Sequence, residues 1–242
     1  MTTENGPSGI ESLRMTINGC NIQCLKAGSG PPVVLVHGGA SDSRDWIGTM
    51  TSLSGRYTFY APDVIGFGQS DRDNKGYYLS DFPDFLLGLI EELRLERPSV
   101  VGHSFGGRVC LDAALQGPDR VGRLVVVDSS GLGRMSWLGS FLFTFFWALR
   151  KVLRRRQPFP RFLSKPGDDY NDVSDETLRG LKTPTLIVWK RCDPYMPLKI
   201  ARRAARLIPG SKLVVFPGYG HAPNKEDPEE FNKILVDFLD NK

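Results

Sequence analysis

The pattern G-x-S-x-G, formed by Gly102, Ser104 and Gly106, constrains the fold of this chain more than any other feature. Apolar residues 99–101 precede it and a stretch with helical periodicity, 108–115, follows, so it predicts a strand, a sharp turn and a helix. In such a turn the serine takes a strained backbone conformation and its hydroxyl projects into a cleft. A glycine-rich turn without any chemistry would show the same pattern, so the rest of the chain must distinguish the two.

Composition places the chain among ordinary globular proteins. Of its 242 residues, 40% are hydrophobic and 24% are charged, as in ordinary globular proteins. This length is enough to bury one sizeable core. The net charge of +4 comes largely from local arginine clusters and no base-reading motif is present, so we expect no nucleic-acid partner. The polar N-terminus lacks a signal-peptide pattern, and the four cysteines show neither C-x-x-C nor zinc spacing. We therefore expect a cytoplasmic protein with reduced thiols, no metal and no cofactor.

Apolar strands alternate with amphipathic helices along the chain. Continuous apolar runs, typical of strands buried on both faces, occur at 33–36, 124–127, 185–189 and 213–216. Residues 82–93 show helical periodicity, and Asn18-Gly19 predicts a two-residue hairpin turn near the start. Asp227 and Glu230 predict a capping box for the last helix. This order of elements predicts an α/β fold with a mostly parallel sheet.

A serine hydroxyl needs a base to act as a nucleophile, and three histidines are available. His37 lies in a turn directly after a strand. His103 is the variable residue beside Ser104 and is expected to point elsewhere. His221 stands in the loop after the last strand, where a loop at the carboxyl edge of a parallel sheet can reach the serine. The predicted base is His221.

Two aspartates could orient that base. Asp193 follows the strand that ends at Trp189 and gives the chain order Ser, Asp, His. Asp128 is the alternative acid, because it ends the strand directly after the serine helix. The Asp193-Pro194 turn at a strand-to-helix junction favours Asp193.

An oxyanion formed in acyl transfer needs two backbone N–H donors. Phe105, directly after the serine, would supply one. The other would come from the loop after the 33–36 strand, where we expect Gly39 to donate, with Ala40 as the alternative.

Taken together, these motifs resemble the α/β-hydrolase superfamily, in its serine-nucleophile, esterase-like branch with a cap inserted after the sixth strand. The matching pieces follow the family order and lie at 36–39, 63–71, 102–107, 193–197 and 220–228. The resemblance implies a mostly parallel eight-stranded sheet with helices on both faces, Ser104 as nucleophile, Asp193 as acid and His221 as base. One departure is Lys190, three residues before Asp193, where family members often carry glycine.

The resemblance also divides the chain. Residues 1–130 and 183–242 would form the hydrolase core, 131–182 a short helical cap, and 1–10 a flexible N-terminus.

Residues 135–149 are uncharged and rich in Trp, Phe and Leu, and a basic cluster, Arg150, Lys151 and 154–156, follows them. As a helix this stretch would span about 22 Å, short of a bilayer core of about 30 Å, so we do not expect it to cross a membrane. The sequence favours a cap helix over the active site. Aromatic anchors beside basic residues would also suit contact with an anionic lipid surface.

On the cap interpretation, the substrate pocket would be lined by apolar side chains of that helix and by the loop after the 33–36 strand. The candidate pocket residues are His37, Gly38, Trp137, Phe141 and Phe145.

The function predicted first is hydrolysis of small-molecule carboxylic esters with apolar acyl groups, through an acyl-enzyme. A serine at the turn argues against the epoxide hydrolase and haloalkane dehalogenase branches, which use aspartate there. The alternatives are hydrolysis of a carbon–carbon bond in a dienoic diketone, as in the ring-fission hydrolases of the superfamily, and a ligand-binding protein that retains the triad. The sequence is compatible with a monomer or a homodimer.

Overall fold

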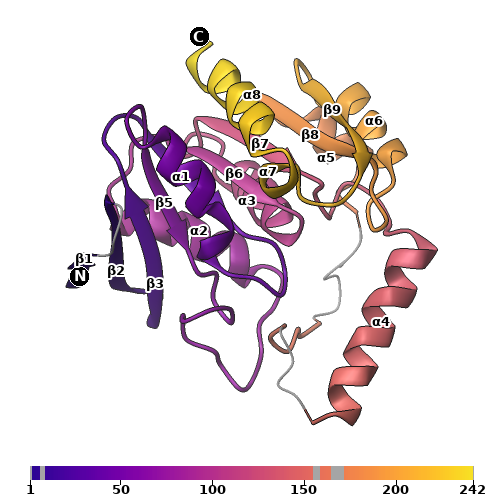
Figure 1. The fold of residues 1–242 in the computed structure, drawn as a ribbon, viewed down its shortest axis with the longest axis horizontal. Helices are drawn as coiled ribbons and strands as arrows, with labels where there is room; N and C mark the ends of the chain where they lie inside the picture. The colour runs from indigo at the N-terminus through magenta and orange to yellow at the C-terminus, as the bar shows by residue number, and fades with distance from the viewer. Residues whose placement is uncertain (1, 6–8, 155–158, 165–171, 242) are drawn as a thin grey trace.

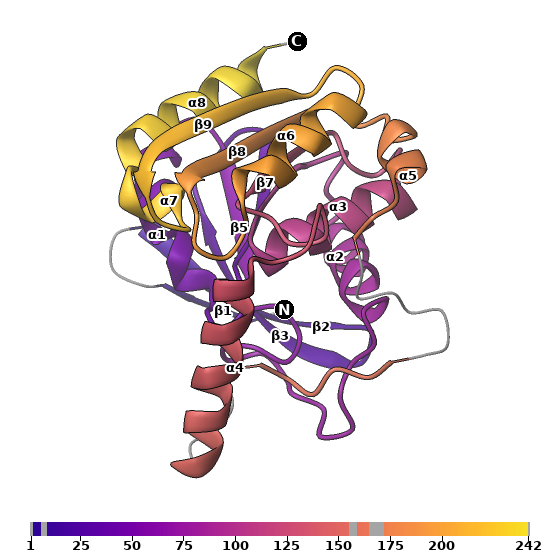
Figure 2. The same cartoon turned by 90° about the vertical axis from the view of Figure 1, so that its right-hand side faces the viewer.

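One sheet crosses the molecule, with helices packed on both of its faces (Figures 1 and 2). The computed structural model describes residues 2–5, 9–154, 159–164 and 172–241. The strands, in chain order, are β1 (Thr2–Asn5), β2 (Ile10–Ile17), β3 (Cys20–Ala27), β4 (Pro32–Val36), β5 (Thr58–Pro62), β6 (Ser99–His103), β7 (Arg123–Val127), β8 (Thr185–Cys192) and β9 (Lys212–Tyr219). Their order across the sheet is β1-β2-β3-β5-β4-β6-β7-β8-β9.

The helices of the described residues follow the expected alternation with strands. They are the 3₁₀ helix η2 (Ser43–Trp46), α1 (Ile47–Leu53), α2 (Asp81–Glu92), α3 (Phe105–Gln116), α4 (Trp137–Val152), α5 (Asp175–Arg179), α6 (Leu198–Leu207), α7 (Pro223–Glu226) and α8 (Pro228–Asp240). Strands β5, β4, β6, β7, β8 and β9 run parallel, so their carboxyl ends lie along one edge of the sheet. The α/β-hydrolase fold predicted from the sequence is confirmed.

The N-terminal part of the sheet is antiparallel. The predicted hairpin joins β2 to β3, and Asn18 and Gly19 both have positive φ, 50° and 81°, as a type I′ turn requires. Strand β1, Thr2–Asn5, pairs antiparallel with β2 and makes nine strands where eight were expected. These residues belong to the N-terminus predicted to be flexible. Their polar sequence gives no strand signal, and the pairing comes from the free edge of β2.

Two apolar layers hold the helices to the sheet. On one face the predicted stripe of α2, which includes Phe82, Phe85 and Leu89, is buried together with side chains of α3 and α6. On the other face α1 and α8 pack on the sheet, and Trp46 and Phe231 lie 6.1 Å apart between their ring centroids. Strand β4 contributes side chains to both layers, as its continuous apolar sequence predicts.

The predicted capping box of α8 is wrong. Asp227 occupies the N-cap position, but its side chain makes no capping hydrogen bond, and Glu230 is exposed. The Asp227 carboxylate instead accepts a hydrogen bond from Nζ of Lys190. A buried ammonium group competes more strongly for this carboxylate than a neighbouring backbone N–H.

The segment after β7 carries α4 and α5. The two views show α4 extending away from the body of the molecule (Figures 1 and 2). Among the residues that the structure describes, no helix combines the length and the apolar character needed to cross a bilayer. Arg155 and Arg156 of the predicted basic cluster lie outside the described residues.

Candidate active site

Ser104 stands at the turn between β6 and α3 with φ 52° and ψ −115°, a conformation that L-residues rarely adopt. The glycines around it are required by close backbone contacts. A side chain at Gly102 would collide with the carbonyl of Gly106, and one at Gly106 would collide with the carbonyls of Val36 and His37. The half-buried Ser104 side chain is therefore held at the carboxyl edge of the sheet, as the sequence predicts.

The structure brings Ser104, His221 and Asp193 into one hydrogen-bonded chain. Nε2 of His221 lies 3.0 Å from Oγ of Ser104, and Nδ1 of His221 lies 2.6 Å from Oδ2 of Asp193. The other oxygen of Asp193 accepts hydrogen bonds from the backbone N–H groups of Tyr195, at 2.7 Å, and Met196, at 2.9 Å. These two bonds fix the carboxylate, so Nδ1 carries a proton and Nε2 is free to accept one from the serine.

Asp128, the alternative acid, lies beside this chain but does not bond to the histidine ring. Its Oδ1 accepts a hydrogen bond from the backbone N–H of Lys190 at 2.8 Å, and its Oδ2 is buried without a partner among the described residues. Burial and the nearby charge of Asp193 raise the pKa of Asp128 to about 8. A carboxyl group that is neutral at pH 7 is poorly suited to stabilise an imidazolium, whereas Asp193 directly contacts His221.

His103 has a contact that the sequence did not predict. Its ring is buried 5.0 Å from the ring of His221, and its Nε2 donates a hydrogen bond to the backbone carbonyl of His221 at 2.6 Å. Burial is the main cause that lowers the pKa of His103 to about 3, so the ring is neutral. The only sequence signal for this role is its place beside Ser104.

His37, a candidate pocket residue, is a structural residue in this fold. It is fully buried, its Nδ1 donates to the carbonyl of Gly38 at 2.7 Å, and its Nε2 accepts from the N–H of Val64 at 3.0 Å. Burial lowers its pKa. Because both ring nitrogens are engaged with backbone, His37 holds the loop after β4 in place and has no ring nitrogen left for another hydrogen bond.

Lys190 and Glu226 hold the loop that carries His221. Oε1 of Glu226 accepts hydrogen bonds from the backbone N–H groups of His221, at 3.0 Å, and Ala222, at 3.2 Å. Lys190, almost fully buried, places Nζ 3.3 Å from Oε2 of Glu226 and also bonds Asp227. The lysine that departs from the family pattern thus supports the histidine loop. Its charge at the end of an apolar strand is the sequence signal that could have indicated this role.

The loop after β4 packs directly against Ser104. A Cβ added at Gly38 would lie 3.4 Å from Cβ of Ser104, and one at Gly39 would collide with the ring of Phe159. Phe105 is the first residue of α3, so its N–H has no partner inside the helix. Both predicted oxyanion donors, Gly39 and Phe105, are on segments adjacent to Ser104.

Aromatic rings pack together beside Gly39 and Phe105, the two residues predicted to donate to the oxyanion. Phe67 contacts the rings of Phe105 and Phe159, with centroids 5.8 and 6.2 Å apart, and Phe159 contacts Phe143 of α4 at 5.1 Å. These residues form an aromatic wall beside the site, which we define as Phe67, Phe105, Phe143 and Phe159.

Three predicted pocket residues, Trp137, Phe141 and Phe145, do not join this wall. Their side chains are exposed on α4, so the structure does not place them in a pocket around the triad. Periodicity could not reveal this, because α4 is apolar on nearly every side.

One group of described residues has the composition of a metal site. Ligand atoms of Asp128, Asp193 and His221 lie within 4.8 Å of one another. The hydrogen bonds among Asp193, His221 and Ser104 already account for two of its three members.

Comparisons with known proteins show which proteins this chain is similar to. The 2-hydroxy-6-oxo-2,4-heptadienoate hydrolase of Pseudomonas putida is 29% identical over 283 residues, which cover 99% of each chain. The solved structure of a serine-to-alanine mutant of a meta-cleavage product hydrolase from Pseudomonas fluorescens IP01 superposes with a TM-score of 0.79 at 27% identity, covering 94% of this chain and 97% of that one. A carboxylesterase from Bacillus subtilis has the same fold, with a TM-score of 0.85 at 21% identity over 97% of this chain and 93% of its own.

A family model, described as the alpha/beta hydrolase family, matches residues 33–234. That range includes the turn at Ser104, Asp128 and Asp193, and the loop of His221. This chain belongs to the alpha/beta hydrolase family and is a hydrolase.

Proposed function

We propose that the protein hydrolyses small-molecule carboxylic esters with apolar acyl groups. The observation that carries this proposal is the continuous hydrogen-bonded chain from Ser104 through His221 to Asp193, with distances of 3.0 and 2.6 Å. In this geometry the histidine can take the proton of the serine, and the buried carboxylate orients the histidine.

In the first half of the reaction, Nε2 of His221 takes the proton of Ser104 as Oγ attacks the ester carbonyl. The negative charge that develops on the carbonyl oxygen is stabilised by the N–H groups of Phe105 and Gly39, and the N-terminus of α3 adds a favourable dipole. Asp193 stabilises the imidazolium. The histidine then returns the proton to the alkoxide leaving group, and the acyl group remains on Ser104.

In the second half, a water molecule attacks the acyl-enzyme and gives its proton to His221. The tetrahedral intermediate collapses, the histidine protonates Oγ of Ser104, and the carboxylic acid leaves. No metal or cofactor takes part in this sequence.

The aromatic wall supports an apolar acyl group. Its four phenylalanines can bury an alkyl or aryl chain, and no charge is provided within the wall itself. Lys190, the buried lysine beside the triad, is already paired with Glu226 and Asp227. This arrangement favours a neutral substrate over an anionic one.

A carbon–carbon bond hydrolase is the second candidate, because the relative from Pseudomonas putida aligns over 99% of both chains and acts, by its name, on a dienoate. The same triad would serve, but a dienoate carries a carboxylate that needs a cation or N–H donors.

One experiment compares the two candidates. Initial rates would be measured on p-nitrophenyl esters of increasing acyl length and on a coloured 2-hydroxy-6-oxo-dienoate, with wild type, Ser104→Ala and the distant control Ser211→Ala. We expect ester turnover that rises with acyl length, a loss of at least about a thousandfold in Ser104→Ala, and an unchanged control. Turnover of the dienoate with inert esters would replace the proposal by the second candidate. Binding of both classes without turnover would instead favour a ligand-binding protein.

A further inference from the structure

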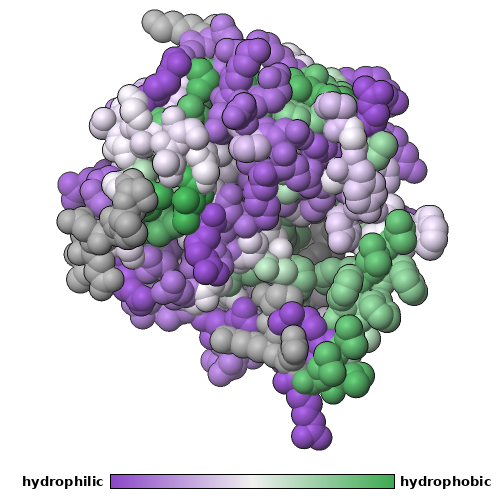
Figure 3. Space-filling view, viewed as in Figure 1, coloured by the Kyte–Doolittle hydropathy of each residue, from purple (hydrophilic) through white to green (hydrophobic). Residues whose placement is uncertain are grey.

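Helix α4 presents its apolar face away from the protein. Trp137 is 81% exposed, Phe141 59% and Val152 79%, and Gly139 is the helix's one buried residue. Hydrophobic surface gathers over this helix at the lower right of the space-filling view (Figure 3). An ordinary surface helix does the opposite and turns its apolar stripe toward the core.

The helical positions show that this face is organised. Residues 137, 141, 145, 149 and 152 recur at spacings of four and three, so their side chains share one side of α4. Ser140, Thr144 and Lys151 border this face and are also exposed, whereas the contacts with the body come from the other side of the helix. A side chain at Gly139 would collide with Tyr195, and Phe143 packs on Phe159. Helix α4 is therefore apolar around most of its circumference, and its contacts at Gly139 and Phe143 leave the face of Trp137, Phe141 and Phe145 exposed.

The N-terminal end of α4 is firmly attached. The hydroxyl of Ser136 caps the helix by accepting from the N–H of Gly139 at 2.8 Å, and it donates to the carbonyl of Pro194. The N–H of Ser136 donates to the carbonyl of Tyr195 at 2.8 Å. The exposed face is thus held in a fixed position next to the loop of Asp193.

The stretch of sequence that contains this helix is basic. Between Asp128 and Asp168 the sequence contains eight basic residues and no acidic one. Arg150 and Lys151 lie in the last turn of α4, and Arg154 follows it. A second copy of this chain would bring a basic surface against a basic surface, whereas an anionic surface would be attracted.

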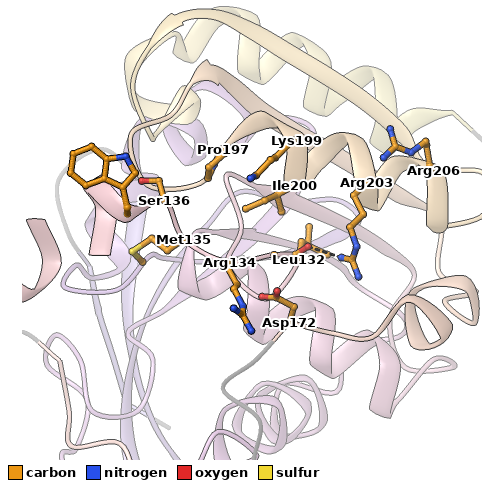
Figure 4. A pocket seen from close by; sticks show the side chains of 12 residues that line it. Leu132, Arg134, Met135, Ser136, Asp172, Pro197, Lys199, Ile200, Arg203 and Arg206 are labelled. Atoms are coloured by element: carbon orange, nitrogen blue, oxygen red, sulfur yellow. Dashed lines mark hydrogen bonds between the residues drawn. The ribbon is translucent and has the colours of Figure 1, made fainter. Parts of the chain in front are cut away.

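A basic groove lies at the other end of the helix. It has a volume of about 670 Å³ and is formed by the segment that leads into α4 and by α6, with Trp137 on its wall (Figure 4). Four basic side chains line it, Arg134, Lys199, Arg203 and Arg206, with one acidic residue, Asp172. Arg203 is engaged with the carbonyl of Leu132 and with Asp175. The groove meets the apolar face at Trp137.

We propose that α4 and this basic groove form a docking surface for an anionic phospholipid membrane. The apolar face of α4 enters the boundary between headgroups and acyl chains, and basic residues at both ends contact lipid phosphates. A helix of 16 residues is about 24 Å long, so it lies along the surface and does not cross it. This docking does not depend on which bond the enzyme hydrolyses.

Flotation with liposomes tests the proposal. The full-length protein would be mixed with vesicles of phosphatidylcholine alone or of phosphatidylcholine with phosphatidylglycerol. Two double variants probe the two parts of the surface, Phe141→Ser with Phe145→Ser, and Lys151→Glu with Arg154→Glu. The matched controls, Ile47→Ser on α1 and Lys233→Glu on α8, change exposed residues on helices that cover the opposite face of the sheet.

We expect wild type and both controls to float with the anionic vesicles, and binding to weaken as salt is added. Loss of two basic charges should lower the partition coefficient by about 25-fold or more, at about fivefold for each charge near the surface. Loss of each ring should lower it by about tenfold. Circular dichroism and thermal melting would verify that each variant remains folded.

Wild type that stays unbound with anionic vesicles would overturn the proposal. So would equal binding by the controls and the α4 variants. Light scattering tests the alternative, that a second copy of this chain covers the exposed face of α4. A dimer that dissociates in Phe141→Ser with Phe145→Ser, together with no vesicle binding, would show that a second copy covers α4.

Discussion

Oε2 of Glu226 lies 3.3 Å from Nζ of Lys190, and Oε1 of the same carboxylate accepts the backbone N–H of His221. The Glu226 side chain therefore joins Lys190, on β8, to the loop that carries His221, the predicted base. The lysine also donates its backbone N–H to Asp128. This connection fixes the loop of His221 relative to the strand that leads to Asp193.

Replacing Lys190 by Met should lower both stability and activity. The change leaves Glu226 without its cation and removes the bond to Asp227, and both carboxylates are partly exposed, so we expect a loss of about 1–3 kcal/mol in the free energy of unfolding. Urea denaturation would measure it, with Lys212→Met, an exposed lysine on β9, as the control. Equal unfolding midpoints for the two variants would contradict this role.

Glu226 should act on kcat more than on KM. In Glu226→Ala the N–H groups of His221 and Ala222 lose their acceptor, so the imidazole is less well held and kcat should fall about tenfold. Glu226→Gln keeps an oxygen acceptor and should recover most of that loss. Glu229→Ala, which changes an exposed residue in the first turn of α8, is the control. A change confined to KM would show that Glu226 serves substrate binding instead.

Asp193 and Asp128 should respond differently to substitution by Asn. Asp193→Asn should reduce kcat by about 10⁴, because the amide cannot stabilise the imidazolium. Asp128→Asn should keep activity within about tenfold, since a neutral amide resembles the protonated carboxyl group in size and charge. Comparable losses in the two variants would mean that both carboxyl groups orient His221.

The pKa of Asp128, raised to about 8, also has a consequence for stability. An unfolded aspartate has a pKa of about 3.9, so between that value and about 8 the native state holds a proton that the unfolded state has lost. The contribution of Asp128 to stability is therefore present at low pH and declines as the pH rises to 8. The free energy of unfolding of wild type minus that of Asp128→Asn should fall across this window. A difference that is constant with pH would mean that the pKa of Asp128 is not raised.

His103→Leu should slow the enzyme by about tenfold, because the carbonyl of His221 loses its donor at 2.6 Å. His103→Gln offers a replacement N–H and should recover activity.

The pKa of about 3 for His103 lies below the unfolded value of about 6.5, so the native state resists protonation while the unfolded state accepts it. Wild type should therefore lose more stability than His103→Leu as the pH falls from 6.5 to 3. Parallel pH curves for the two proteins would contradict this effect.

The features predicted correctly depend on local patterns or on chain order. The dipeptide Asn18-Gly19 predicts the hairpin because these residues readily adopt the positive φ angles of its turn, and continuous apolar runs predict the buried strands. Ser104, Asp193 and His221 meet because parallel strands bring their carboxyl ends to one edge. The pairing of Lys190 with Asp227 spans 37 residues of sequence, and no local pattern reports it. It also explains why the capping box failed.

The orientation of α4 could not be predicted for a different reason. Hydrophobic periodicity identifies the face that meets the core only when the other faces are polar. In α4 apolar residues occur around most of the helix, so the sequence favoured a cap over the active site, and the structure shows an exposed face instead. The side of α4 that faces the body is determined by the contacts of Gly139 with Tyr195 and of Phe143 with Phe159, which are distant in sequence.

The backbone conformation at Ser104 is less favourable for serine than for glycine. A residue held at φ 52° and ψ −115° costs about 1–3 kcal/mol relative to a relaxed conformation, and glycine would adopt these angles freely. Ser104→Gly should therefore yield a protein that is inactive and yet harder to unfold. The proposed chemistry requires a hydroxyl group at this position, whereas the backbone conformation favours glycine.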